Sequence, residues 1–110
     1  MLRQSMDTAE HRAQFRIAAS HPALPGHFPG APVVPGVVVL DEVRAIAERW
    51  LGAPLALAGL PQVKFSAPLL PGRTARVRLQ REGARLRFTV SDAAGAPLAS
   101  GVLALAEWPP

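Results

Sequence analysis

Three residues with the makings of an acid–base site lie within fifteen positions of one another. His27 stands in a loop rich in proline and glycine, Gly36 follows Pro35, and Asp41 comes five residues after Gly36. An imidazole with an ordinary pKa near 6.5 can remove a proton near neutral pH. A carboxyl group can return one, and the free N–H groups at a helix start can stabilise an oxyanion. Together these groups suit the elimination of water from a 3-hydroxyacyl thioester.

Gly36 fits the oxyanion role because it has no Cβ, so a carbonyl oxygen can approach its N–H closely. Such a donor lowers the barrier by about 3–4 kcal/mol. Asp41 lies about 7.5 Å further along the helix axis. An aspartate has a reference pKa of about 3.9, so Asp41 acts as the acid only if burial keeps it protonated. A nearby helix N-terminus favours the anion instead, and a water held by Asp41 is the alternative proton carrier.

The elements that must position these residues follow from the apolar pattern. Residues 36–51 carry apolar side chains at helical spacing, and Gly52 and Pro54 end the predicted helix. Its first turn is apolar nearly all round, so we expect that end to be buried. The preceding segment, 21–35, excludes a helix or a central strand and predicts a rigid extended loop because it holds five prolines: Pro22, Pro25, Pro29, Pro32 and Pro35.

The second half of the chain predicts β-structure. Residues 55–65 are mostly apolar, 75–80 and 84–90 alternate apolar side chains with polar and basic ones, and 98–106 form the last predicted strand. Before the loop we expect a short strand at 15–18 and a loosely docked leader over residues 1–13, with His11 solvated in it. One apolar helix and several antiparallel strands predict an α+β fold in a single domain over residues 1–110, with the sheet wrapped around one central helix.

Composition excludes several classes of protein. The 110 residues are 49% hydrophobic and 18% charged, which is typical of a globular domain rather than a disordered chain. Cysteine is absent, which excludes disulfides and a thiolate nucleophile and fits a reducing compartment. The apolar runs are too short to span a membrane, and the N-terminus is too polar for a signal peptide. We therefore expect a cytoplasmic protein. The three histidines lack metal-ligand spacing, so no metal site is predicted.

The net charge of +4 at pH 7 raises the question of an acidic partner. Nucleic acid is disfavoured because aromatic residues make up only 5% of the chain and do not alternate with basic ones. An acidic protein explains the sign of the charge equally well. The basic face of the predicted hairpin consists of Arg76, Arg78, Arg85 and Arg87. This face is either simply solvated or steers such a protein. Lys64 and Arg73 are alternative contacts for the same partner.

The segment from His27 to Asp41 resembles the active-site segment of the hotdog-fold 3-hydroxyacyl-[acyl carrier protein] dehydratases. That family carries the pattern His-Phe-x-Gly-x-Pro-Val-x-Pro-Gly, followed by an acid fourteen residues after the histidine, which is Asp41 here. Residues 63–72 resemble the family's Lys-Phe-x-x-Pro-Val-x-Pro-Gly segment. The stretches His-Pro-Ala-Leu-Pro-Gly-His-Phe-Pro-Gly and Leu-Asp-Glu-Val are most like the compact dehydratases of aryl-polyene pigment and related polyketide-like pathways.

The resemblance implies a hotdog fold and dehydration of carrier-bound 3-hydroxyacyl thioesters to trans-2-enoyl thioesters, without a cofactor. It implies that His27 and Asp41 are the catalytic pair and that the Gly36 amide binds the thioester carbonyl. We expect three further residues of the same motif to contact substrate: Phe28, Val33 and Pro35. In the family the site forms at a dimer interface, with the histidine from one subunit and the acid from the other.

The expected partners are therefore acyl carrier protein and a second subunit, in a homodimer or in a heterodimer with a related dehydratase. Two other functions remain open at this stage. A hotdog thioesterase shares the fold but hydrolyses the thioester, and the His/Pro-Gly pattern argues against it. A catalytically silent subunit would support an active partner, and the intact His27/Asp41 pair argues against that.

Overall fold

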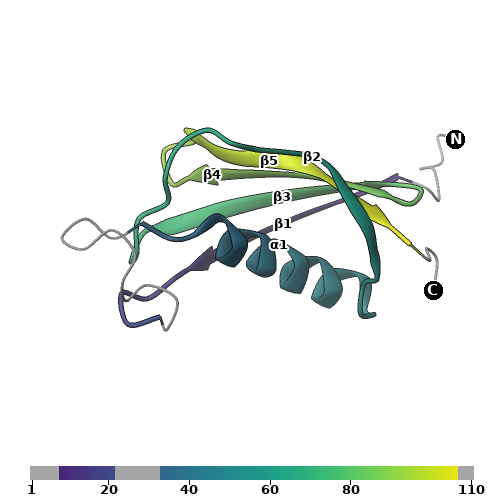
Figure 1. The fold of residues 1–110 in the computed structure, drawn as a ribbon, viewed down its shortest axis with the longest axis horizontal. Helices are drawn as coiled ribbons and strands as arrows, with labels where there is room; N and C mark the ends of the chain where they lie inside the picture. Colours follow the sequence, from purple (N-terminus) through teal and green to yellow (C-terminus); the bar gives the residue numbers. More distant parts are fainter. Residues whose placement is uncertain (1–7, 22–32, 107–110) are drawn as a thin grey trace, which may run out of the picture.

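The computed structural model describes residues 8–21 and 33–106. These residues form an antiparallel five-stranded sheet that lies against one helix, as Figure 1 shows, so the predicted α+β hotdog fold is confirmed. The strand order is β1-β3-β4-β5-β2. The elements in chain order are β1 (Thr8–Arg16), α1 (Gly36–Leu51), β2 (Leu57–Phe65), β3 (Thr74–Glu82), β4 (Arg85–Asp92) and β5 (Pro97–Leu105).

Helix α1 has the predicted boundaries, and one stripe of it faces the sheet. Its C-terminus is closed by Gly52, which adopts the left-handed conformation at φ 75° while its N–H donates to the Glu48 carbonyl at 2.9 Å. Just beyond, the Glu48 carboxylate accepts from the Leu55 N–H at 2.8 Å, and the Arg44 guanidinium donates to the Leu55 carbonyl at 2.6 Å. These bonds hold the chain as it turns from α1 towards β2.

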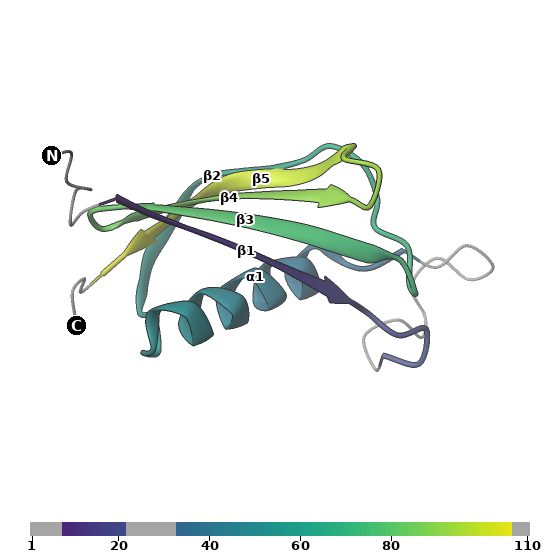
Figure 2. The same ribbon diagram turned by 180° about the vertical axis from the view of Figure 1, so that it is seen from behind.

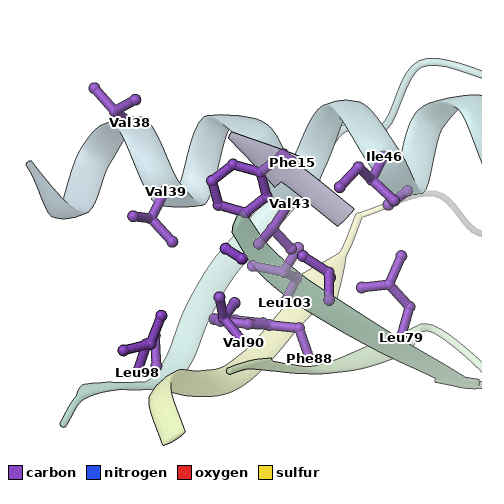
Figure 3. Close-up of a cluster of buried hydrophobic side chains, with 14 of the residues drawn as sticks. Phe15, Val38, Val39, Val43, Ile46, Leu79, Phe88, Val90, Leu98 and Leu103 are labelled. Atoms are coloured by element: carbon purple, nitrogen blue, oxygen red, sulfur yellow. The ribbon is translucent and has the colours of Figure 1, made fainter. Parts of the chain in front are cut away.

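The core lies between α1 and the inner face of the sheet. Figure 3 shows α1 side chains such as Val43 and Ile46 above Phe88 and Leu79 of the sheet. Strands β3 and β4 alternate buried and exposed positions, as the sequence pattern predicts for a hairpin with one apolar and one basic face. Phe88 and Leu79 are completely buried, so the centre of the sheet is closed to solvent on this side.

Strand β1 corrects the prediction for the N-terminal part of the chain. It begins at Thr8 rather than near Phe15 and pairs along its whole length with β3, so residues 8–13 belong to the sheet and are not part of a leader. His11 is half-buried rather than solvated, with its ring stacked on Trp50 of α1 at a centroid distance of 5.2 Å. The sequence pattern does not predict this part of the strand, because its inward positions before Phe15 hold alanine and histidine instead of large apolar residues.

The first turn of α1 is less buried than its composition predicts. Val38 and Val39 are buried, but Val37 is 65% exposed, the most exposed large hydrophobic side chain among the described residues. The neighbouring strand β2 is an edge of the sheet, and its pairing with β5 is interrupted on either side of Gly59. Apolar side chains thus remain uncovered where the start of α1 adjoins the free edge. No helix in the described part of the chain is long and apolar enough to cross a membrane.

Candidate active site

An apolar groove of about 500 Å³ lies where α1 begins, between the helix and the sheet. Its walls come from the end of the proline-rich loop, from the first turns of α1 and from the segment that follows β2. Figure 3 shows Val39 pointing from α1 towards Val90 and Leu98 of the sheet, and all three line the groove. Its described lining residues are Val33, Val34, Pro35, Gly36, Val39, Phe65, Ser66, Ala67, Pro68, Leu69, Val90, Leu98 and Ala99.

A backbone hydrogen bond joins two segments that lie far apart in the sequence. The first Pro-Gly motif ends at Pro35-Gly36, and the second covers residues 63–72 and ends at Pro71-Gly72. The Val34 N–H donates to the Leu69 carbonyl at 2.9 Å, and both side chains are buried. Further along the second motif, the Gly72 N–H donates to the Ile17 carbonyl at 2.8 Å. The end of the proline-rich loop is thereby held against the second motif, which places Gly36 at the rim of the groove.

The start of α1 presents unused hydrogen-bond donors to this groove. Its N-cap is Pro35, which makes no side-chain capping bond, and the Pro35 carbonyl accepts from Val38 at 3.0 Å and Val39 at 3.3 Å. The N–H groups of Gly36 and Val37 have no acceptor among the described residues. The first turn also carries no acidic side chain to neutralise the positive end of the helix dipole. The groove therefore has an anion-stabilising amide at one end.

The ring of Phe65 points at Gly36 with its Cζ end. A Cβ built on Gly36 would stand 2.7 Å from Phe65 Cζ and 3.1 Å from each Cε. With the ring in this position, residue 36 has no room for a Cβ, and its absence also lets a carbonyl oxygen approach the N–H closely. Phe65 is 51% exposed and stands at the end of edge strand β2, so its ring has room to turn away.

The structure brings together only some of the residues predicted for the site. Val33, Pro35 and Gly36 all line the groove. Asp41 lies on α1 with its side chain exposed to solvent and is absent from the groove lining. The apolar first turn therefore does not desolvate Asp41 within one chain, contrary to the mechanism expected for keeping it protonated. His27 and Phe28 lie outside the described residues.

Sequence reasoning missed several groove residues. Phe65, Ser66 and Leu69 belong to the second Pro-Gly motif, which is recognisable in the sequence. The spacing of its residues does not predict that this motif lies against Gly36. Ser66 carries the one polar side chain among the described lining residues. The groove is accordingly suited to an acyl chain, with polar recognition concentrated at the start of α1 and at Ser66.

Comparison with known proteins agrees with this geometry. Residues 3–102 match the model of the ApeI-like family, described as ApeI dehydratase. The 3-hydroxyacyl-[acyl-carrier-protein] dehydratase FabZ of Desulforamulus reducens is 36% identical over 81 residues, which cover 67% of this chain and 56% of that protein. The chain thus spans little more than half the length of this curated relative.

Solved structures share the fold across nearly the whole chain. An uncharacterized protein from Erwinia carotovora subsp. atroseptica superposes with a TM-score of 0.83 at 26% identity, covering 96% of this chain and 90% of that one. The dehydratase heterocomplex ApeI:P from Xenorhabdus doucetiae superposes with a TM-score of 0.77 at 23% identity, covering 97% of this chain and all of that one. These two likenesses show the shared fold, and the family match over residues 3–102 shows that the chain belongs to the ApeI-like dehydratase family.

Proposed function

We propose that this protein dehydrates 3-hydroxyacyl-[acyl carrier protein] thioesters to trans-2-enoyl thioesters, in fatty-acid-like or aryl-polyene biosynthesis. The observation that carries the proposal is the apolar groove with the free Gly36 amide at its rim. An acyl chain fits the apolar walls, and the thioester oxygen meets the N–H at the positive end of α1. The relatives named 3-hydroxyacyl-[acyl-carrier-protein] dehydratase support the choice of substrate.

The proposed reaction needs one base and one acid. His27 removes a proton from C2 while the Gly36 N–H stabilises the negative charge that develops on the thioester oxygen. The C3–O bond then breaks, and Asp41, or a water that it holds, donates the proton that lets the hydroxyl leave as water. The products are a trans-2-enoyl thioester, water, a protonated imidazole and the deprotonated acid. The imidazolium loses its proton to solvent and the acid regains one, which restores both groups for the next turnover.

A second subunit completes the site in this proposal. The exposed Asp41 carboxylate and the exposed Val37 and Phe65 side chains leave one face of the site uncovered in a single chain. A partner that covers this face would desolvate Asp41 and bring the imidazole and the carboxyl group of different subunits together. We propose a homodimer, with a heterodimer of the kind named for the ApeI:P structure as the alternative. The cytoplasmic location and the single-domain organisation stay predictions.

The purified chain tests the assignment with a 3-hydroxyacyl carrier protein as substrate. Mass spectrometry of the carrier should show the loss of one water. His27→Ala and Asp41→Asn should each lower turnover by about 100-fold or more while circular dichroism stays unchanged. Glu42→Gln, a change of the same type at the next position of α1, should keep near-wild-type turnover.

Three outcomes would contradict the proposal. Release of free acid in place of water loss would indicate a thioesterase. A wild-type chain that is active only with a related dehydratase, and whose His27→Ala and Asp41→Asn variants support that activity equally well, would indicate a silent subunit. Comparable turnover in Asp41→Asn and in the wild type would remove the acid from the mechanism.

A further inference from the structure

The outer face of the sheet, which points away from α1, concentrates the positive charge of the whole chain. In the part of the chain that the structure describes, alternation along the strands exposes seven cations on this face and two carboxylates, Glu10 and Glu82. The face therefore carries five positive charges, whereas all other charged residues together sum to one negative charge. The seven cations are Arg12, Arg16, Lys64, Arg76, Arg78, Arg85 and Arg87.

Strand register sets these cations side by side. Arg12 lies directly opposite Arg78, and the same row continues through Thr89 and Ser100 to Lys64. Like charges at opposite positions of an antiparallel pair destabilise a sheet. Glu10 pairs with both Arg12 and Arg78 and offsets part of this repulsion, but one carboxylate leaves the row with an excess of positive charge that an acidic partner would neutralise.

Arg76 stands at the centre of a groove of about 690 Å³ on this face, between β1, β3 and β4. Its cross-strand neighbours are Gln14 and Ser91, which are neutral and can form hydrogen bonds. Arg76 makes no ion pair with any described residue. The next row holds Arg12 and Arg78, which share one carboxylate. Glu10, opposite Gln80, accepts from Arg78 Nε at 2.9 Å and from Arg12 Nε at 3.2 Å, so the two arginines and Glu10 together keep a net positive charge.

The observations favour one kind of occupant. If a second copy of this chain docked through the same face, two surfaces that each carry five net positive charges would repel each other. Single-stranded nucleic acid binds on aromatic stacking platforms, and the outward positions of the described strands hold no aromatic side chain. A protein surface rich in carboxylates complements the arginines in both charge and hydrogen-bonding geometry.

We propose that the outer face docks the acidic carrier protein that delivers the acyl thioester, with Arg76 at the centre of the contact. The inference rests on the function proposed above and adds the surface that receives the carrier. Figure 2 shows β1 ending and β3 beginning at the end of the sheet where α1 begins. The row of Arg76 therefore lies near the same end of the sheet as the apolar groove and the Gly36 amide.

A charge reversal with a matched control tests the docking surface. Arg76→Glu changes the face, and Arg49→Glu makes the same charge change at an exposed position of α1 that also lacks an ion pair among the described residues. Each variant is assayed with a 3-hydroxyacyl carrier protein and with the same acyl group on N-acetylcysteamine. Arg76→Glu should lower kcat/KM for the carrier substrate about tenfold at low salt, mainly through KM, and should leave the small thioester unchanged. Arg49→Glu should change neither.

Glu10→Gln supplies a test in the opposite direction, because it removes a carboxylate from the face. It should lower the KM for the carrier substrate about twofold or more, and added salt should abolish the differences among all variants. Wild-type kcat/KM of Arg76→Glu on the carrier substrate would overturn the docking proposal while leaving the proposed function intact. A change of oligomeric state in Arg76→Glu, or tighter binding of a short duplex DNA than of carrier, would also overturn it. Failure of the wild type on both substrates would instead refute the proposed function.

Discussion

At the scale of single residues, two glycine positions are too close to other atoms for a Cβ, but the neighbouring atoms differ. Gly36 faces the tip of the half-exposed Phe65 ring, which can turn into solvent. Gly101 lies in β5, where an added Cβ would collide with the Gln62 carbonyl oxygen of β2 and stand 2.9 Å from the completely buried Phe88 ring. Backbone and a buried ring cannot yield as an exposed ring can, so the same substitution has unequal consequences at the two positions.

We expect Gly101→Ala to lower the free energy of unfolding by about 2–3 kcal/mol and Gly36→Ala by less than about 1 kcal/mol. Activity should show the reverse order for the folded proteins, since Gly36→Ala displaces Phe65 and narrows the approach to the amide. Urea denaturation of both variants, paired with turnover of a 3-hydroxyacyl thioester, checks this. A Gly36→Ala protein as unstable as Gly101→Ala, or as active as the wild type, would contradict it.

At the scale of elements, β1 is held to its neighbour β3 by a polar contact on the exposed face as well as by the ladder. Glu10 reaches across to Arg78, whose Nε and Nη2 lie 2.9 and 3.2 Å from its two carboxylate oxygens. Hydrogen bonds from Arg78, and to a smaller extent from Arg12, lower the pKa of Glu10 below its usual 4.5. A carboxyl group whose pKa is lowered on folding stabilises the native state when ionised, and that stabilisation is lost as pH falls through the folded-state pKa.

The wild type should therefore be more stable than Glu10→Gln well above pH 4.5, and the difference should shrink and vanish as the pH falls below that value. Thermal unfolding of both proteins across this range measures the effect, which should also decrease with added salt because the pair is exposed. A difference that is independent of pH would show that the two side chains differ in something other than charge.

At the scale of the whole molecule, a single chain leaves its candidate site open. Within residues 8–21 and 33–106, the large hydrophobic side chains that remain exposed are Val37 (65%), Phe65 (51%) and Leu70 (42%). The first two flank the start of α1 and the end of edge strand β2. Exposed apolar side chains beside an unpaired strand edge are features that a second subunit covers. The exposed Asp41 lies one turn further along the same helix.

Val37→Asp should therefore give a folded monomer with little dehydratase activity, because a charge at this position opposes burial against a partner. Ala84→Asp, at an exposed turn at the far end of the sheet, should keep the wild-type assembly and activity. Light scattering after size-exclusion chromatography, together with turnover, checks both variants. A Val37→Asp protein that assembles and turns over like the wild type would contradict the proposed interface.

The sequence by itself determined the elements whose signals are local. The boundaries of α1 follow from the proline-rich loop before it and from Gly52 after it, and the β3–β4 hairpin follows from strict alternation. The match of His27, Gly36 and Asp41 to a known motif indicated the chemistry. The N-terminal strand was predicted only over residues 15–18, and the part of β1 before Phe15 was missed. Small and polar inward residues carry little periodic signal there, and the strand's extent comes from pairing with β3.

Only the tertiary structure decided what lies across the chain from these residues. It set Phe65 against Gly36, joined Val34 to Leu69, left Asp41 in solvent and arranged the arginines of three strands in adjoining rows on one face. These relations depend on contacts between residues far apart in sequence. Such contacts follow from strand order, register and packing, none of which is encoded in the periodicity of any single segment.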